Sequence, residues 1–143
     1  MITVEKAIQI ISKNIKKTAY FEEVNVSEAR NQVLFEDIKS PIDMPPFRQS
    51  AMDGYALNLH DIKQYYLRGE IQAGDESHPV LKKGEAFRIF TGAPVPDSAN
   101  AIIMQEKTSQ INNDVVVDSQ PVKSHNIREI GAQIKKGQIA LAQ

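Results

Sequence analysis

After residue 50 the chain consists of short apolar runs separated by turn residues, and this alternation restricts the fold more than any other feature. The runs are rich in β-branched and aromatic residues, as strands are. Glycine, asparagine and aspartate lie between them, and no helical period is long enough for a βαβ unit or a helical hairpin. The pattern predicts a small, mainly antiparallel sheet or a partly closed barrel. The expected strands are residues 55–57, 65–67, 86–90, 101–104 and 115–117.

The start of the chain predicts an amphipathic helix instead. Its apolar residues recur at steps of three and four, which places them on one face. Thr3 is the expected N-cap, and the pair Lys16-Lys17 suits the last turn. The apolar face consists of Val4, Ala7, Ile8, Ile11 and Ile15.

Three prolines, Pro41, Pro45 and Pro46, separate this helix from the strand-rich region. Proline restricts itself and the residue before it to extended backbone, so a helix is excluded there. The fold class is therefore α+β, with an amino-terminal helix and a proline-rich linker followed by a β-rich lobe. The expected parts are residues 1–45 for the helix and linker, 46–124 for the lobe, and 125–143 for a segment that returns toward the linker.

Composition excludes several classes of function. The 143 residues are 41% apolar and 24% charged, with a net charge of −1, as in ordinary globular domains. No basic stripe can neutralise a nucleic-acid backbone, and no apolar run has the length that a bilayer requires. The absence of cysteine removes thiolate metal sites and cysteine nucleophiles. Because the first residues lack the pattern of an export signal, we expect a cytoplasmic protein that binds neither nucleic acid nor a membrane.

Asp53 lies in the first of three segments that could carry chemistry, Pro45 to Ala56. The proline pair leads into a loop of small and polar residues, and Gly54 allows the carboxylate to project from a tight turn. A fixed carboxylate near Ser50 could hold Mg²⁺ or act as a general base. An Asp-Gly pair is also a common plain turn, so the residues alone leave both interpretations open.

The second and third segments supply candidate anion-binding groups. In Phe90 to Pro96, Thr91 precedes a glycine and can present a hydroxyl and amides to an oxyanion. A proline-braced loop without a binding role fits the same pattern. In His125 to Gln133, Arg128 could bind the oxygens of phosphate or a similar oxyanion with two N–H groups. A surface arginine paired with a nearby acid is the alternative.

Together the three segments resemble the molybdopterin molybdenumtransferase family, also called MoeA. Residues 50–56, which read Ser-Ala-Met-Asp-Gly-Tyr-Ala, are similar to its first signature. Residues 88–96 and 101–106 are similar to its second signature and the continuation, and residues 126–128 with Gly131 to its third. The order and the separations also agree, and the likeness extends over the whole chain.

This resemblance implies a function. Members of the family insert molybdate into adenylylated molybdopterin with release of AMP, are assisted by Mg²⁺, and form homodimers. It implies that Asp53 and Thr91 are catalytic, that Ser50 and Arg128 bind substrate, and that Asp53 is a Mg²⁺ ligand. It also implies the upstream molybdopterin adenylyltransferase as a partner. A pterin-binding domain is expected after residue 143, and without that domain this part of the enzyme is expected to be inactive.

The chain departs from the family pattern at one place. After the glycine of the third signature the family usually carries Glu-Asp, and the aspartate is counted among its active-site acids; here the residues are Ala132-Gln133. A neutral amide can form hydrogen bonds but cannot supply negative charge to Mg²⁺ or take a proton at neutral pH. This change leaves open a diverged paralogue with a scaffold role. The amphipathic helix and the sheet leave open a second alternative, a non-catalytic dimerisation or binding module.

Overall fold

The computed structural model describes residues 2–16 and 20–143 of the chain. These residues belong to two compact units, one made of Met1–Asp37 with Gln143 and the other of Ile38–Ala142. The first unit contains the helix and the second contains the strands.

The helix α1 (Val4–Asn14) confirms the helix predicted at the start of the chain. The Thr3 hydroxyl accepts a hydrogen bond from the Lys6 amide at 3.2 Å, so the predicted N-cap is present. The helix ends at Asn14, earlier than expected, and the basic residue of its last turn is Lys13. The pair Lys16-Lys17 falls beyond it, the second lysine outside the described residues. No residue of α1 is buried, so its apolar face is not covered by the described residues of this unit.

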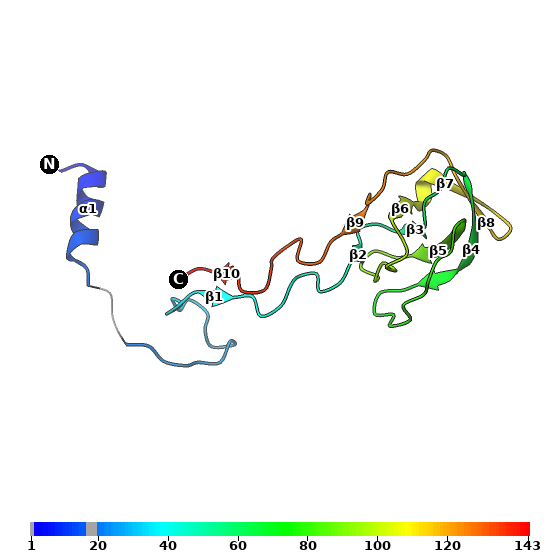
Figure 1. The fold of residues 1–143 in the computed structure, drawn as a ribbon. Coiled ribbons are helices and arrows are strands. Elements are labelled where there is room, and N and C mark those ends of the chain that lie inside the picture. Colours follow the sequence, from blue (N-terminus) through cyan, green and yellow to red (C-terminus); the bar gives the residue numbers. More distant parts are fainter. Residues whose placement is uncertain (1, 17–19) are drawn as a thin grey trace. The chain divides into compact units, whose positions relative to one another are not determined.

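A curled six-stranded sheet forms the main part of the second unit (Figure 1), in the order β6-β3-β5-β4-β8-β7. Neighbouring strands are antiparallel except β4 and β5, which run parallel, so the predicted mainly antiparallel sheet is confirmed. The elements are β3 (Gly54–Leu57), β4 (Gln64–Ile71), β5 (Glu85–Ile89), β6 (Ala101–Met104), the 3-10 helix η1 (Gln105–Lys107), β7 (Thr108–Ile111) and β8 (Asp114–Val117).

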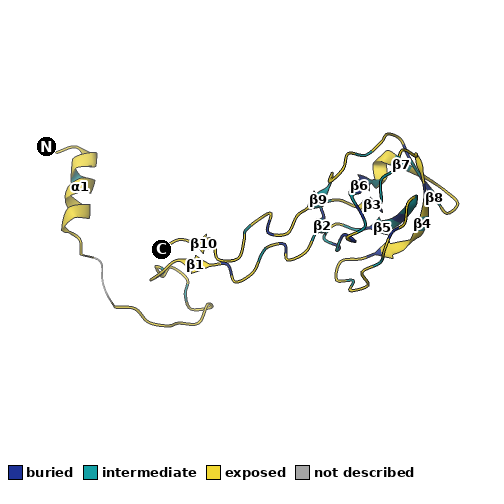
Figure 2. Ribbon diagram, in the orientation of Figure 1, coloured by how far each residue is buried: buried dark blue, intermediate teal, exposed yellow. Residues whose placement is uncertain are grey.

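Apolar residues of this sheet form two buried clusters, and parts of its strands are coloured as buried in Figure 2. In β3, Ala56 joins one buried cluster, while Tyr55 and Leu57 join another. Neighbouring residues of β6, Ile102 and Ile103, divide in the same way. Because successive side chains of a strand point to opposite faces, β3 and β6 are buried on both sides. The loops at the site thus leave strands that are packed on both faces.

Two short antiparallel strand pairs complete the unit. The strand β1 (Ile38–Lys39) pairs with β10 (Ile139–Leu141), and β2 (Gln49–Ser50) pairs with β9 (Ile127–Arg128). Between them the proline-containing segment lies beside the returning chain, since the Pro45 carbonyl accepts the Gly131 amide at 2.9 Å. The divisions expected at residues 45/46 and 124/125 fall inside this unit, and they stay predictions.

Candidate active site

The three segments predicted to carry chemistry meet where β2 and β9 join the loop after β5. Ser50 donates its amide to the Ala93 carbonyl at 3.0 Å, and its carbonyl accepts the Gly92 amide at 2.9 Å. These bonds join the first segment to the second. Ala51 donates its amide to the Asn126 carbonyl at 2.9 Å, which joins the third. Segments far apart in the sequence therefore form one region of the surface.

Asp53 and Thr91 are joined directly within this region. The Asp53 carboxylate accepts two hydrogen bonds on the same oxygen, Oδ1, from the Thr91 amide and from the Thr91 hydroxyl, each at 2.7 Å. Both residues are exposed. Asp53 is therefore more than part of a plain Asp-Gly turn, because its side chain is fixed to another loop while it faces the solvent.

The same contacts keep Asp53 charged. The hydrogen bonds from the Thr91 amide and hydroxyl lower the pKa of the Asp53 carboxyl below its ordinary value, and the positive charge of Arg88 acts in the same direction. Donors that bind the carboxylate stabilise the ionised form over the protonated form. At neutral pH the site thus presents a carboxylate with a fixed orientation.

Gly54, the residue after Asp53, permits a close approach between β3 and β6. A Cβ atom at this position would lie 1.9 Å from the Ile103 carbonyl oxygen and 2.8 Å from its carbon. Both are backbone atoms of a paired strand, so neither can turn away as a side chain could. Any larger residue would move the strand on which the Asp53 loop depends.

Arg88 is a residue of this region that the sequence analysis did not single out. It lies opposite Tyr55 in the β3–β5 pair, and its guanidinium donates to the Gly54 carbonyl at 2.9 Å and to the Gln105 side-chain oxygen. The guanidinium carbon lies 5.3 Å from the centre of the Tyr55 ring and 5.0 Å from that of Phe90. Its position two residues before Phe90, on the same strand face, is the sequence signal that could have identified it.

Ser50, predicted to bind substrate, has a fully buried side chain. Its hydroxyl donates to the Met52 carbonyl at 2.6 Å and accepts the Met52 amide at 3.4 Å. In this structure the hydroxyl shapes the turn that leads to Asp53. A direct contact with substrate stays a prediction.

Arg128, the second predicted substrate ligand, is exposed on β9 opposite Gln49. The neighbouring acid Glu129 is paired with another arginine, Arg48, at 3.8 Å. Among the described residues no hydrogen bond or ion pair engages the Arg128 guanidinium, so its N–H groups can receive an oxyanion.

The described residues fit Mg²⁺ only with help from other ligands. They contain no group of three or more histidine or acidic side chains placed to hold a metal ion. Both hydrogen bonds to Asp53 use Oδ1, which leaves Oδ2 as one ligand atom from the described part of the chain. Mg²⁺ is commonly bound by one or two carboxylates together with substrate phosphates and water. A site of that kind fits Asp53, whereas a cage made only of the described side chains does not.

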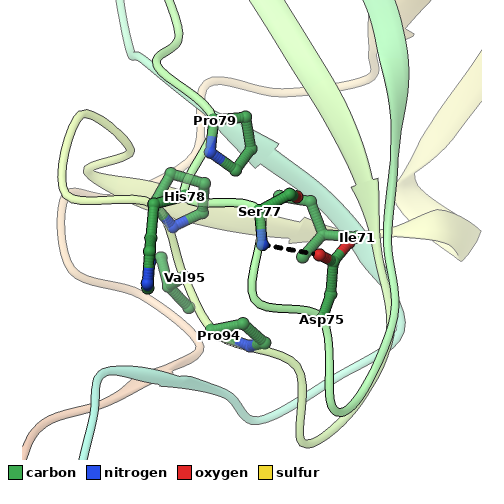
Figure 3. A pocket seen from close by; sticks show the side chains of 8 residues that line it. Ile71, Asp75, Ser77, His78, Pro79, Pro94 and Val95 are labelled. Atoms are coloured by element: carbon green, nitrogen blue, oxygen red, sulfur yellow. Dashed lines mark hydrogen bonds between the residues drawn. The ribbon is translucent and has the colours of Figure 1, made fainter.

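A small hollow beside the second segment is too narrow for a substrate (Figure 3). Its volume is about 10 Å³, room for roughly one water molecule. The Asp75 carboxylate at its edge accepts the Ser77 amide at 2.7 Å, and this loop bond is drawn in Figure 3. The residues that line the hollow are Ile71, Asp75, Ser77, His78, Pro79, Pro94, Val95 and Pro96. The candidate site is therefore the exposed Asp53–Thr91 pair and not this hollow.

These features define a β-rich lobe that presents a fixed carboxylate and a hydroxyl on adjoining loops, and an open guanidinium on the strand β9. The sequence model of the family described as "MoeA N-terminal region (domain I and II)" matches residues 2–143. The chain belongs to this family.

Relatives and solved structures agree with this assignment. The molybdopterin molybdenumtransferase of Haemophilus influenzae is 36% identical over 147 aligned residues, which cover 100% of this chain and 36% of the relative. That of Staphylococcus epidermidis is 30% identical, over 98% of this chain and 35% of the relative. The crystal structure of the molybdopterin biosynthesis MoeA protein from Pyrococcus horikoshii superposes with a TM-score of 0.85 at 29% identity, over 97% of this chain and 39% of that one.

The chain spans about a third of the length of the curated relatives that it matches. Among residues 2–16 and 20–143, no helix combines the length and the apolar character needed to cross a membrane.

Proposed function

We propose that this chain is the part of a molybdopterin molybdenumtransferase that presents Asp53 and Thr91 to an anionic substrate. In the proposed reaction adenylylated molybdopterin releases AMP, and molybdate enters the pterin compound to form molybdenum cofactor. Membership of the family and the names of the relatives support the pathway. Homodimer formation, a cytoplasmic location and contact with the upstream adenylyltransferase remain part of the proposal.

The observation that carries this proposal is the meeting of the three segments at the Asp53–Thr91 pair. Two donors fix one carboxylate oxygen, and the exposed position leaves the other oxygen accessible. Arg128 lies on the strand paired with β2, and its guanidinium suits phosphate or molybdate oxygens. Cleavage of a pyrophosphate builds negative charge on the departing oxygen, and aimed donors and cations offset that charge.

Asp53 has one of two roles in this proposal. Its Oδ2 atom would hold Mg²⁺ together with substrate phosphate oxygens, or the carboxylate would accept a proton as a general base. The ion, when bound, supplies positive charge to the phosphate oxygens. Both roles require an ionised carboxylate, and the lowered pKa of Asp53 supplies one at neutral pH.

The test compares Asp53→Asn with the wild-type sequence in the complete product of the gene that encodes this chain. The amide keeps an oxygen acceptor for Thr91 but removes the negative charge. We expect formation of molybdenum cofactor from adenylylated molybdopterin and molybdate to fall by roughly 100-fold or more, the range of a lost general base. Asp75→Asn is the matched control, because Asp75 is also a loop aspartate whose pKa is lowered by hydrogen bonds from a hydroxyl and a backbone amide, those of Ser77. Equal cofactor formation by Asp53→Asn and the wild type removes Asp53 from the mechanism.

A non-catalytic dimerisation module is the second candidate, and α1 favours it. Its apolar face is exposed, with Val4 at 71%, Ile8 at 57% and Ile11 at 55%. Amphipathic helices usually bury such a face against another surface. Sedimentation of the wild type and of Ile8→Asp tests this role. If Ile8→Asp still forms the dimer, α1 is not the dimer interface. If the wild type forms molybdenum cofactor, the protein is not a non-catalytic module.

The scaffold alternative depends on Ala132-Gln133. The backbone amide of Gln133 donates to the Met44 carbonyl at 2.9 Å, and the Gln133 side chain is exposed. The side chain can therefore be exchanged without disturbing that backbone bond. If the wild-type gene fails to restore a cofactor-deficient strain despite normal expression, and Gln133→Asp restores it, the scaffold role is supported.

A further inference from the structure

Arg88 connects the groups that surround Asp53, although it does not touch the carboxylate through any hydrogen bond that the structure shows. Its guanidinium donates to the Gly54 carbonyl at 2.9 Å and to the Gln105 side chain. The backbone amide of Gln105 in turn donates to the Asp53 carbonyl at 3.2 Å. Both carbonyls of the Asp53-Gly54 dipeptide are thus held by Arg88 or by its partner.

The guanidinium itself has little freedom. It lies near the rings of Tyr55 and Phe90, at 5.3 and 5.0 Å from their centres. Tyr55 is only 7% exposed, so at least one of these rings belongs to the packed core. A planar cation that stacks on aromatic rings and donates in two directions is a task for arginine, which lysine performs poorly.

We propose that Arg88 is a positioning residue for the reaction: by fixing the backbone of Asp53 and Gly54, it sets the direction in which the Asp53 carboxylate meets Thr91 and the substrate. Two constraints then act on Asp53. Arg88 and Gln105 hold the main chain at Asp53 and Gly54, and Thr91 holds the Asp53 side chain. Displacements of about an ångström at such groups cost catalytic rate steeply. The part of this inference that concerns catalysis rests on the proposed function.

The first test needs no activity, and it uses Arg88→Met and Arg88→Lys in the 143-residue chain. The NMR signal of the Thr91 amide proton reports its hydrogen bond to Asp53, and Asp53→Asn serves as the reference for its perturbation. Arg88→Met is expected to shift this signal, because the guanidinium that holds the Gly54 carbonyl and the Gln105 side chain is lost. Arg88→Lys keeps the charge but loses the planar fork, so it should also shift the Thr91 signal. If Arg88→Met does not fold, Arg88→Lys is the variant that is compared with the wild type.

Arg68→Met is the matched control. Arg68 lies on the neighbouring strand β4, stacks on Tyr66 at 5.9 Å and pairs with Glu85 at 3.6 Å, and neither contact involves the Asp53 loop. Arg68→Met should leave the Thr91 signal unchanged. A Thr91 signal that is the same as in the wild type in both Arg88 variants overturns the inference.

The second test is a double-mutant cycle for cofactor formation by the complete gene product. Arg88→Met should lower kcat about tenfold when Asp53 is present, and less than about twofold in the Asp53→Asn background, because residues that act through one another are not additive. An equal loss in both backgrounds means that Arg88 only stabilises the sheet, and it overturns the positioning role. If the wild type forms no cofactor, the proposed function fails, while the Thr91 signal still decides whether Arg88 positions Asp53.

Discussion

Gly54→Ala should destabilise the β-rich lobe strongly, and the reason is steric. The added methyl carbon would lie 1.9 Å from the Ile103 carbonyl oxygen, whereas carbon and oxygen atoms that are not bonded normally stay roughly 3.3 Å apart. The φ angle of Gly54 is not in the left-handed region, so alanine would meet no strain from its own backbone. The whole effect must come from separation of β3 and β6.

The size of the effect follows from that separation. Relief of the clash requires a movement of about 1.4 Å, which lengthens hydrogen bonds of about 2.9 Å beyond any useful distance. Because β6 is buried apart from Met104, the bonds that break leave polar groups without water. Overpacking together with unsatisfied backbone groups should lower the free energy of unfolding by about 3 kcal/mol or more. With a urea m-value of about 1.5 kcal/mol per M, the midpoint should fall by about 2 M.

Urea unfolding followed by tyrosine fluorescence measures this change, since Tyr65 is fully buried in the lobe. Gly74→Ala is the control, because a Cβ atom there meets nothing within 4 Å and only the φ angle of +86° opposes it. That strain should cost about 1 kcal/mol. If Gly54→Ala is no less stable than Gly74→Ala, the close approach of β3 and β6 is refuted.

Three further changes test the contacts around Asp53. Thr91→Val removes the hydroxyl donor and keeps the amide, so the pKa of Asp53 should rise toward its ordinary value in an NMR titration; an unchanged pKa contradicts the bond from the hydroxyl. Because the folded-state pKa of Asp53 is lowered, its contribution to stability is present above the ordinary carboxyl pKa and is lost as pH falls through the lowered value. Asp53→Asn should therefore flatten the acid side of a plot of unfolding midpoint against pH, and a curve identical to that of the wild type refutes this linkage. Ser50→Ala should lower the free energy of unfolding by about 1 kcal/mol with Km unchanged in the complete gene product, since the hydroxyl binds the Met52 carbonyl; a raised Km with wild-type stability would instead support its role as a substrate ligand.

The sheet was largely predictable from the sequence, and the features that the prediction missed have physical reasons. The cores of β3, β5, β6 and β8 were expected because their runs are apolar and bounded by turn residues. The strand β7, with the sequence Thr-Ser-Gln-Ile, was missed because it lies at the exposed edge of the sheet and carries little apolar signal. The parallel pairing of β4 with β5 depends on how the loop between them crosses, and local patterns do not encode it.

The candidate site was predictable in its residues but not in its contacts. Asp53 and Thr91 stood out from their loops and from the family resemblance, whereas their hydrogen bonds connect positions far apart in the sequence. The hydroxyl of Ser50 was expected to bind substrate, and in the structure it forms a local turn with Met52. Arg88 escaped notice because one of its partners is a backbone carbonyl, which no sequence motif reports.

The central claim is that the three loop segments present an ionised Asp53 to a pyrophosphate-bearing substrate. The most direct measurement is the single-turnover rate of AMP release from adenylylated molybdopterin by the complete gene product, for the wild type, Asp53→Asn and Asp75→Asn. A rate lowered roughly 100-fold or more in Asp53→Asn alone is the predicted result. AMP release at the wild-type rate in Asp53→Asn would contradict the claim.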